Sequence, residues 1–164
     1  MEPSQFFIDE YDSPIGKITL AACDDMLCGL WFVGQKYYMA GVPENCVANA
    51  NVPILKHAKQ WLDKYFAGMQ PRATELTISP HGTEFQRRVW RALVDIPYGA
   101  TATYGDIARR IGAKSPRAVG VAIGHNPISV IIPCHRVIGA NGDMTGYAGG
   151  LGIKRYLLTH EGAI

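Results

Sequence analysis

Apolar and polar positions follow two different patterns in the two halves of the chain. The first half contains two short runs rich in apolar residues, Ile15–Leu20 and Leu27–Val33, separated by an acidic pair. Such runs, bounded by turn residues, predict two strands of a hairpin or meander. A helical period follows in ILKHAKQWLDKYFAG, where apolar residues recur three and four positions apart and Gly68 stands just past the end. The first half therefore reads as a small sheet with one main helix.

Helical patterns dominate the second half. The stretch EFQRRVWRALVDI follows Thr83, a residue type preferred at the N-cap of a helix. Two shorter helices are predicted in TYGDIARRIG, capped by Thr103, and in SPRAVGVAIG, where Ser115 is the N-cap and Pro116 the first helical residue. Only the residues GAK separate these two, which is typical of a helix-turn-helix unit.

The remaining segments complete the predicted architecture. PRATELTISPHG has no helical period and is interpreted as a last strand and a connector, with a domain boundary near Pro80 to Thr83. HNPISVIIP predicts a turn and then a strand that leads to Cys134, and LGIKRYLLTHEGAI predicts a closing helix. We therefore expect an α/β (α+β) fold: an N-terminal α/β domain over 1–80, then a mostly helical, winged-helix-like domain over 83–164.

Composition narrows the functional classes only slightly. The chain has 164 residues and a net charge of +2, so no overall basic character points to a nucleic-acid partner. The N-terminus has no apolar core of the kind found in signal peptides, and no run approaches the roughly 18 apolar residues of a membrane helix. We expect a soluble, cytoplasmic monomer without a membrane partner.

The four cysteines are Cys23, Cys28, Cys46 and Cys134. A disulfide framework is not expected in an intracellular chain of this length, because thiols stay reduced there. The stretch CDDMLC resembles a loose zinc site that would need a histidine such as His57 or His81, but ordinary burial is the favoured interpretation. Cys134 differs from the others because a histidine and an arginine follow it directly.

The neighbours of Cys134 suggest nucleophilic chemistry. A thiolate is the reactive form of cysteine, and a histidine oriented by a third group is the usual way to produce it. His135 is adjacent in sequence, and adjacent side chains on a strand point to opposite faces, so a bend or a bridging water is required. Glu161 is the favoured orienting group, with His160 as the competing choice. Arg136 is interpreted mainly as part of a buried hydrogen-bond network.

The predicted helix after Ser115 is unusually slim. Between Arg117 and Ile123 it carries only Ala, Val and Gly, and Gly120 in a helix interior costs on the order of 1 kcal/mol relative to Ala. Close packing against another helix is one explanation. Close approach to a nucleic-acid groove, with Arg117 at the leading end, is the other.

These stretches together resemble one known family. IPCHRVIG, followed by GYAGGLGIKRYLLTHEG and preceded by TYGDIA and RAVGVAIGHNP, is similar to the O6-alkylguanine-DNA alkyltransferases, also called methylated-DNA–protein-cysteine methyltransferases. The resemblance covers Phe85 to Gly162 with the motifs in order. It is weaker over the first 80 residues, where DSPIGKITLAA and WLDKYFAG still match.

The resemblance implies a DNA repair reaction that each molecule performs once. Cys134 matches the cysteine that takes an alkyl group from O6 of guanine, and the thioether that forms is not hydrolysed. His135 matches the histidine that acts through a water as general base, and Glu161 matches the acid that orients it. The reaction needs no cofactor. Some members bind zinc in the N-terminal domain, but here only Cys23 clearly falls at a ligand position, with Cys28 a substitute for a histidine, so no metal is predicted.

The resemblance also assigns the DNA-binding residues. The slim helix matches a recognition helix that enters the minor groove, which is only about 6 Å wide. Arg117 matches the arginine that fills the gap left by the flipped nucleotide, and Tyr104 the tyrosine that crowds the target phosphate and contacts the flipped guanine. The other predicted DNA-binding residues are small: Ser115, Ala118, Gly120, Ala122 and Gly124. Arg87, Arg88, Arg91 and Arg136 are further candidates for phosphate contacts.

The predicted substrate-binding residues surround the cysteine. Asn126 matches the asparagine that ties the recognition helix to the active-site loop, and Lys154 a lysine that supports that loop. The backbone carbonyls of Cys134 and Val137 would read the guanine amino group. Tyr147, Ala148 and Gly149 match the loop that closes over the base. Ala148 departs from members that carry Ser there, and Thr145 and Ser129 line the expected pocket at positions that vary in the family.

The predicted partner is double-stranded DNA containing O6-alkylguanine. The sequence leaves open the range of alkyl groups, activity on O4-alkylthymine and cooperativity on DNA. Two other functions were weighed: a binding module that recognises alkylguanine without repairing it, and a DNA-binding regulator that senses alkylation. The presence of Cys134 argues against the first, and the chain length leaves no room for the extra DNA-binding domain of the second.

Overall fold

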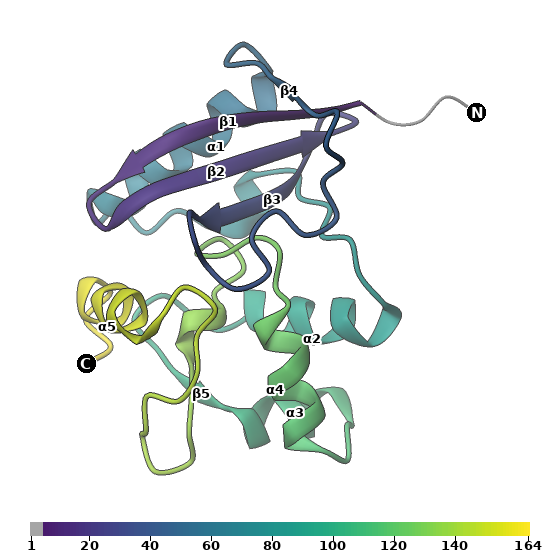
Figure 1. The fold of residues 1–164 in the computed structure, drawn as a ribbon. Coiled ribbons are helices and arrows are strands. Elements are labelled where there is room, and N and C mark those ends of the chain that lie inside the picture. Colours follow the sequence, from purple (N-terminus) through teal and green to yellow (C-terminus); the bar gives the residue numbers. More distant parts are fainter. Residues whose placement is uncertain (1–4) are drawn as a thin grey trace.

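The structure is a computed structural model, and it describes residues 5–164 of the chain. Figure 1 shows a sheet in the upper part of the molecule and a group of helices below it. The sheet consists of β1 (Phe6–Ser13), β2 (Gly16–Cys23), β3 (Met26–Phe32) and the short β4 (Val47–Ala48), in the order β3-β2-β1-β4. The first three strands are antiparallel, and β4 runs parallel to β1. The predicted meander is therefore confirmed.

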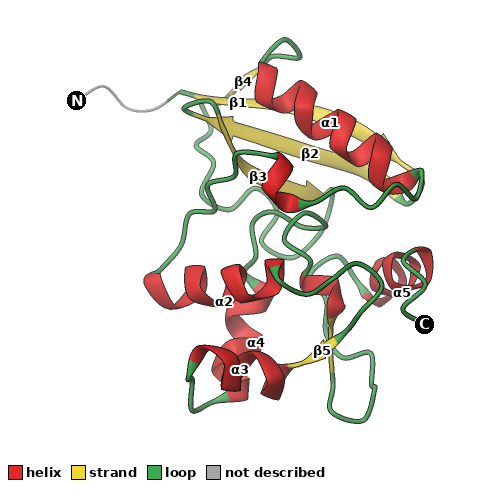
Figure 2. Ribbon diagram, turned by 180° about the vertical axis from the view of Figure 1, so that it is seen from behind, coloured by secondary structure: helices red, strands yellow, loops and turns green. Residues whose placement is uncertain are grey.

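A single long helix covers one face of this sheet. Helix α1 (Pro53–Phe66) lies along the sheet in Figure 2 and begins with Pro53 at the first helical position, where the missing N–H costs nothing. Gly68 takes a left-handed φ of 82° just past the end, as the sequence predicts. The buried side chains of α1 are spaced three and four residues apart and face the sheet: Ile54, Leu55, Ala58, Trp61, Leu62 and Tyr65.

The helices of the second half are capped as their sequences predict. They are α2 (Glu84–Val94), α3 (Tyr104–Ile111), α4 (Pro116–Gly124) and α5 (Leu151–His160). Thr83 and Thr103 form capping boxes with Gln86 and Asp106, and the Ser115 hydroxyl accepts from the N–H of Ala118. A turn of a few residues joins α3 to α4, so the helix-turn-helix unit is confirmed. A small parallel pair, β5 (Ala102–Thr103) and β6 (Val137–Ile138), lies beside it.

One apolar core joins the two halves. The buried cluster runs from Ile18 on β2 through the helices to Leu157 on α5. Backbone hydrogen bonds connect the halves directly: Leu30 N–H of β3 donates to the Pro127 carbonyl at 2.9 Å, and Ser129 N–H donates to the Leu30 carbonyl at 3.0 Å. The sheet is thus attached to the segment that leads to Cys134.

Three segments differ from the sequence-based expectation. The strand Phe6–Ser13 was not predicted, because its acidic and aromatic residues mask the alternation of a half-exposed strand. PRATELTISPHG contains no strand; it forms a short 3-10 helix, Ala73–Glu75, and a single bridge between Leu27 and Ile78.

The segment before Cys134 is also not a strand. Only Ile128 makes a bridge, with Leu30, and the chain then turns through Val130, which has a left-handed φ of 70°. All its apolar side chains are buried because sheet and helices cover the segment from both sides. A buried apolar run looks the same in sequence whether it is extended or folded into turns.

Candidate functional site

Cys134, His135 and Arg136 form one turn of 3-10 helix, and all three are buried. A 3-10 helix has three residues per turn, so successive side chains point about 120° apart rather than to opposite faces. The prediction of a bend after Pro133 is therefore confirmed. This turn sends the thiol towards a surface hollow and the imidazole towards the interior.

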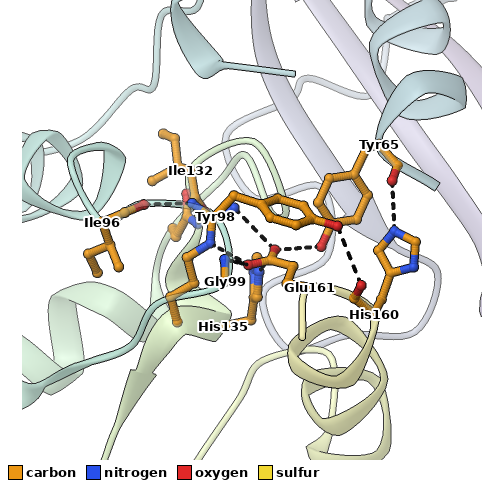
Figure 3. A network of polar contacts seen from close by, with 10 residues as sticks. Tyr65, Ile96, Tyr98, Gly99, Ile132, His135, His160 and Glu161 are labelled. Atoms are coloured by element: carbon orange, nitrogen blue, oxygen red, sulfur yellow. Dashed lines mark hydrogen bonds and ion pairs between the residues drawn. The ribbon is translucent and has the colours of Figure 1, made fainter. Parts of the chain in front are cut away.

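The carboxylate of Glu161 holds the imidazole in place. His135 Nε2 donates to Glu161 Oε2 at 2.6 Å, and the Tyr65 hydroxyl donates to the same oxygen at 2.7 Å. Arg136 donates through Nε to Oε1 at 2.7 Å and through a terminal nitrogen to Oε2 at 3.1 Å, and Gly99 N–H donates to Oε1 at 3.2 Å. Figure 3 shows these groups converging on Glu161. Five donors from four residues thus saturate one buried carboxylate.

The charges in this network follow from those contacts. Burial alone would raise the pKa of Glu161, but the hydrogen bonds from His135 and Arg136 and the charge of Arg136 hold it well below its usual range. Burial lowers the pKa of His135 and outweighs the opposing influence of Glu161. At neutral pH the site therefore holds a carboxylate, a guanidinium and a neutral imidazole.

The tautomer of His135 follows from the same geometry. A carboxylate only accepts hydrogen bonds, so Nε2 carries the hydrogen and Nδ1 keeps a lone pair. Nδ1 is buried and has no hydrogen-bond partner among residues 5–164. A neutral imidazole with a free lone pair is a base.

The thiol of Cys134 is held in its protonated form. Burial raises its pKa, and this outweighs the side chains of Asn126 and Tyr147 and the charge of Lys154, which act in the opposite direction. The Tyr147 hydroxyl is itself buried near the thiol. Reaction of this thiol consequently requires a base that removes its proton.

Two polar side chains fix the backbone around the thiol. Asn126, just after α4, donates through Nδ2 to the Ile132 carbonyl at 2.8 Å and accepts from Ile128 N–H at 3.0 Å. Asn126 thus links the helix-turn-helix unit to the segment before Cys134, as predicted from the resemblance.

Lys154 ties the loop after Cys134 to α5. Its ammonium is almost fully buried and donates to the carbonyls of Val137 at 2.7 Å, Thr145 at 2.9 Å and Gly146 at 3.2 Å. Burial lowers the pKa of Lys154 to about 8. The Val137 carbonyl, expected to read a guanine amino group, is engaged by this lysine in the structure.

A hollow of about 720 Å³ opens above the thiol. Helix α4 and the loop before α5 form two of its walls, and no acidic residue is among those that line it. The lining residues include part of the predicted site: Tyr104, Arg117, Gly120, Gly124, Cys134, Tyr147 and Ala148. Thr145, predicted to line the pocket, does so. The sequence did not predict that Lys36 and Tyr37, from the first half of the chain, also line it.

The faces of α4 separate the predicted DNA-binding residues. Ser115, Arg117 and Ala118 are exposed near its start, whereas Ala122 is buried, and its carbonyl accepts from the indole of Trp90. Ala122 was predicted to contact DNA, but its side chain is buried. Residues four apart lie on the same face of a helix, so Ala122 differs from Ala118 because α2, with Trp90, packs against this part of α4.

Gly120 is not required by packing inside the protein. A Cβ at this position would lie 3.5 Å from the ring of Tyr104, which is ordinary van der Waals contact. Tyr104 in turn donates its hydroxyl to the Thr145 carbonyl at 3.1 Å. Close packing inside the protein therefore does not explain the slim helix. The remaining explanation is the close approach of another molecule from outside.

Several predicted residues act from below the hollow. Asn126, Val137, Lys154 and Gly149 do not line it; they support its walls through backbone contacts or pack beneath it. Ser129 is buried next to Gln35. Arg136 makes the buried network that the sequence analysis favoured over a phosphate contact, including a hydrogen bond to the Ile96 carbonyl at 2.6 Å.

His160 does not compete with Glu161 for the imidazole. Its Nε2 lies 2.7 Å from the Tyr65 carbonyl (Figure 3), so it attaches α5 to α1. Tyr65 is the residue of this network that sequence reasoning missed, because it sits on the apolar face of α1 and reads as core.

Residues 5–164 contain neither a metal-binding cluster nor a helix able to span a membrane. Among residues 5–164 no group of three or more His, Cys, Asp and Glu side chains lies close enough to hold a metal ion. Cys23 and Cys28 are buried and form no disulfide. Within that range, no helix combines the length and the apolar character needed to cross a membrane.

Comparison with known proteins gives one consistent result. The family model described as "6-O-methylguanine DNA methyltransferase, ribonuclease-like domain" matches residues 9–80, and "6-O-methylguanine DNA methyltransferase, DNA binding domain" matches residues 84–163. A methylated-DNA–protein-cysteine methyltransferase of Methanosarcina acetivorans is 48% identical over 93% of this chain and 96% of its own length. The protein of that name from Mycolicibacterium paratuberculosis is 49% identical over 92% of this chain and 88% of its own.

Solved structures agree with the sequence relatives. The crystal structure of Mycobacterium tuberculosis OGT in complex with DNA matches with a TM-score of 0.85 and 42% identity, over 97% of this chain and 93% of that one. The family models cover both halves of the chain, and Cys134, His135 and Glu161 lie close to the helix-turn-helix unit. This chain therefore belongs to the 6-O-methylguanine DNA methyltransferase family.

Proposed function

We propose that this protein repairs duplex DNA by moving the alkyl group from O6 of guanine to its own Cys134, irreversibly and once per molecule. The observation that carries the proposal is the position of the thiol. Cys134 lies in a hollow walled by the helix-turn-helix unit, directly beside a neutral histidine whose orientation a buried carboxylate fixes. The relatives named above are methyltransferases that act on methylated DNA.

The chemistry begins with removal of the thiol proton. His135 Nδ1 is the base, and a bridging water carries the proton to it, because the two side chains leave the 3-10 turn in different directions. Glu161 keeps Nε2–H in place and so keeps the lone pair on Nδ1. Arg136 neutralises Glu161, which leaves the imidazole uncharged and able to accept.

The alkyl transfer is an in-line displacement. The Cys134 sulfur attacks the alkyl carbon, a C–S bond forms, and the C–O6 bond breaks with its electron pair going to guanine. The guanine anion then takes up the proton that the thiol released and becomes an ordinary base. The thioether product has no thiol left to ionise, so the same molecule cannot react again.

Access to the base requires flipping. Helix α4 enters the minor groove with its small residues Ala118, Gly120 and Gly124, and Arg117 takes the place of the extruded nucleotide. Tyr104 crowds the target phosphate at the rim of the hollow. Tyr147, Ala148 and Gly149 close over the guanine, with the Cys134 carbonyl available to its amino group. These roles rest on the matching positions and on the lining of the hollow.

The proposal also includes two domains, residues 1–80 and 83–164, and a cellular location. The second part carries the DNA-binding and transfer residues, and the first supports them. The thiols of Cys28, Cys46 and Cys134 suit a reducing compartment such as the cytoplasm. We place the protein there, as a monomer that uses no cofactor.

Intact-protein mass spectrometry tests the proposal. The protein is mixed with a duplex oligonucleotide containing O6-methylguanine, beside a Cys134→Ser control. We expect a stoichiometric gain of about 14 Da, one methyl group replacing a hydrogen, mapped to the Cys134 peptide and absent from the control. Tight duplex binding with no mass gain would instead identify a binding module that does not repair.

A further inference from the structure

One turn of the first half of the chain reaches the reactive hollow. It follows β3 and spans Gly34 to Tyr38, and its residues Lys36 and Tyr37 line the same hollow as Cys134. Any molecule that fills the mouth of this hollow therefore meets the N-terminal half as well as the helix-turn-helix unit.

The turn is held firmly on both sides. The Gln35 side chain is buried, and its Oε1 accepts from Phe32 N–H at 2.8 Å and from the Ser129 hydroxyl at 3.5 Å. Lys36 N–H donates to the Ala148 carbonyl at 3.0 Å. The turn is thus attached to its own sheet, to the segment before Cys134 and to the loop after it.

Tyr37 is held against α4 in a strained conformation. Its ring stacks on the ring of His125, with centroids 4.0 Å apart and planes 21° from parallel. The backbone of Tyr37 has a left-handed φ of 60°, and Met39 has 56°. A left-handed conformation is strained for residues other than glycine, and such strain persists where the surroundings enforce it, often at functional sites.

The side chain of Lys36 is exposed and has no carboxylate partner among residues 5–164. Its ammonium lies 5.2 Å from the centre of the Tyr37 ring. Arg117 is the other positively charged side chain among the described residues that line the hollow, and none of these residues is acidic. Two positive charges on different walls of one mouth are complementary to a nucleic-acid backbone.

We infer that Lys36 contacts a phosphate of the damaged DNA close to the flipped nucleotide, so that the first half of the chain takes part directly in DNA binding. The inference rests on the proposed function, because the duplex lies over the hollow only if its guanine is to reach Cys134. The stack of Tyr37 on His125 fixes the turn against α4, so Lys36 keeps a constant position relative to Arg117. The contact is electrostatic and independent of sequence.

The salt dependence of binding tests this contact. Binding of a labelled duplex containing O6-methylguanine is measured by fluorescence anisotropy over a range of salt concentrations, in a Cys134→Ser background that binds without transfer. For Lys36→Gln we expect the slope of log affinity against log salt to become shallower by about 0.9, the value for one phosphate contact. Affinity at about 0.1 M salt should fall roughly 3- to 10-fold. Lys36→Arg should restore both.

The controls separate this inference from the proposed function. Lys56→Gln removes an exposed lysine on α1 that does not line the hollow, and it should leave the slope unchanged. A wild-type slope in Lys36→Gln overturns the phosphate contact, and so does weaker binding with an unchanged slope, which would mean that the turn acts through packing. Failure of the proposed function shows separately, as absence of methyl transfer by the protein with Cys134 intact.

Discussion

At the scale of single residues, the decisive feature is a carboxylate shared by donors from both halves of the chain. Glu161 accepts hydrogen bonds from His135 and Arg136, which lie in the same 3-10 turn as Cys134. It also accepts one from Tyr65 of α1, the helix that covers the sheet. A neutral, correctly oriented imidazole is thus the product of contacts far apart in sequence. The orientation of His135 thus depends on a hydroxyl that lies 96 residues before Glu161 in the chain.

Tyr65→Phe tests that dependence. The substitution keeps the ring and removes one donor from an ionised, buried oxygen, a loss of about 1.5–3 kcal/mol in the free energy of unfolding. With His135 less firmly held, we expect the single-turnover rate of methyl transfer to fall several-fold. Urea denaturation and rapid-quench kinetics measure the two effects.

Tyr98→Phe is the matched control. Its hydroxyl donates to the His160 carbonyl at a long 3.4 Å and does not touch Glu161, although its ring packs against Tyr65. It should change the rate little. Equal losses in both variants would show that general packing, and not the bond to Glu161, maintains the site.

The pH dependence of the rate follows from the two shifted groups. His135 accepts a proton only when neutral, and burial lowers its pKa from 6.5, so the rate should hold at pH 6.5 and fall only at lower pH. Burial raises the pKa of Cys134 from 9.0, so direct ionisation should add rate only above pH 9.0. We expect a flat profile between these values, measured as single-turnover methyl transfer. A rate that climbs steadily from pH 6.5 to 9.0 would mean that His135 is not the base.

Stability should respond to acid in the same direction. Below pH 6.5 the unfolded chain protonates His135 while the folded chain does not, so the free energy of unfolding falls as the pH falls. Glu161, whose folded pKa is lowered from 4.5, adds a second loss below that pH. Thermal unfolding across this range measures both.

At the scale of elements, the glycine in the middle of α4 lowers the stability of the helix but keeps it slim. Gly120 costs about 1 kcal/mol relative to alanine, and the space for a methyl group exists. Gly120→Ala should therefore raise the free energy of unfolding by about 0.5–1 kcal/mol. It should also weaken binding of the lesion duplex, because the added methyl group faces the hollow. Denaturation measures the expected gain in the free energy of unfolding, and fluorescence anisotropy measures the expected loss of affinity for the duplex.

Gly105→Ala on α3 is the comparison for that trade. Its Cβ would also lie in ordinary contact, 3.5 Å from Arg109, but position 105 does not line the hollow. Stability should rise with little change in DNA affinity. Undiminished duplex binding by Gly120→Ala would show that the glycine serves some purpose other than approach to the groove.

Elements with strong local signals were predictable from sequence. The caps at Thr83, Thr103 and Ser115 bind their own backbone within three residues, so they need no tertiary information. The segment Ile128–Pro133 was predicted as a strand and is a set of turns, because its conformation depends on β3 and on Asn126. The same contrast holds in the site: Cys134, His135 and Glu161 were identified, while Tyr65, Lys36 and Tyr37 arrive through tertiary packing that no local pattern reveals.

At the scale of the whole molecule, the two halves share one core. Leu30 is fully buried on β3, and its backbone bonds the segment before Cys134. We expect a single calorimetric transition for the intact protein. Leu30→Ala should lower the free energy of unfolding by about 2–5 kcal/mol. Hydrogen exchange should then accelerate in α1 and α2 together.

Val33→Ala, directly after the end of β3, is the control for Leu30→Ala. Val33 is 52% exposed, so its truncation removes little buried surface and should cost much less. Two separate transitions, or faster exchange confined to α1, would show that the halves fold as independent units despite the continuous core.

The exposed residues 81–83, between the 3-10 helix Ala73–Glu75 and α2, have a consequence for the kinetics of the reaction. A chain cut there would yield two fragments, each with an apolar face shaped to fit the other, and the hydroxyl of Tyr65 would lie on one while its partner Glu161 lay on the other. Repair by one molecule would then become repair by an encounter of two. Its rate would rise with the concentration of each fragment, and the methyl group left on the thiol would record how often the fragments had met.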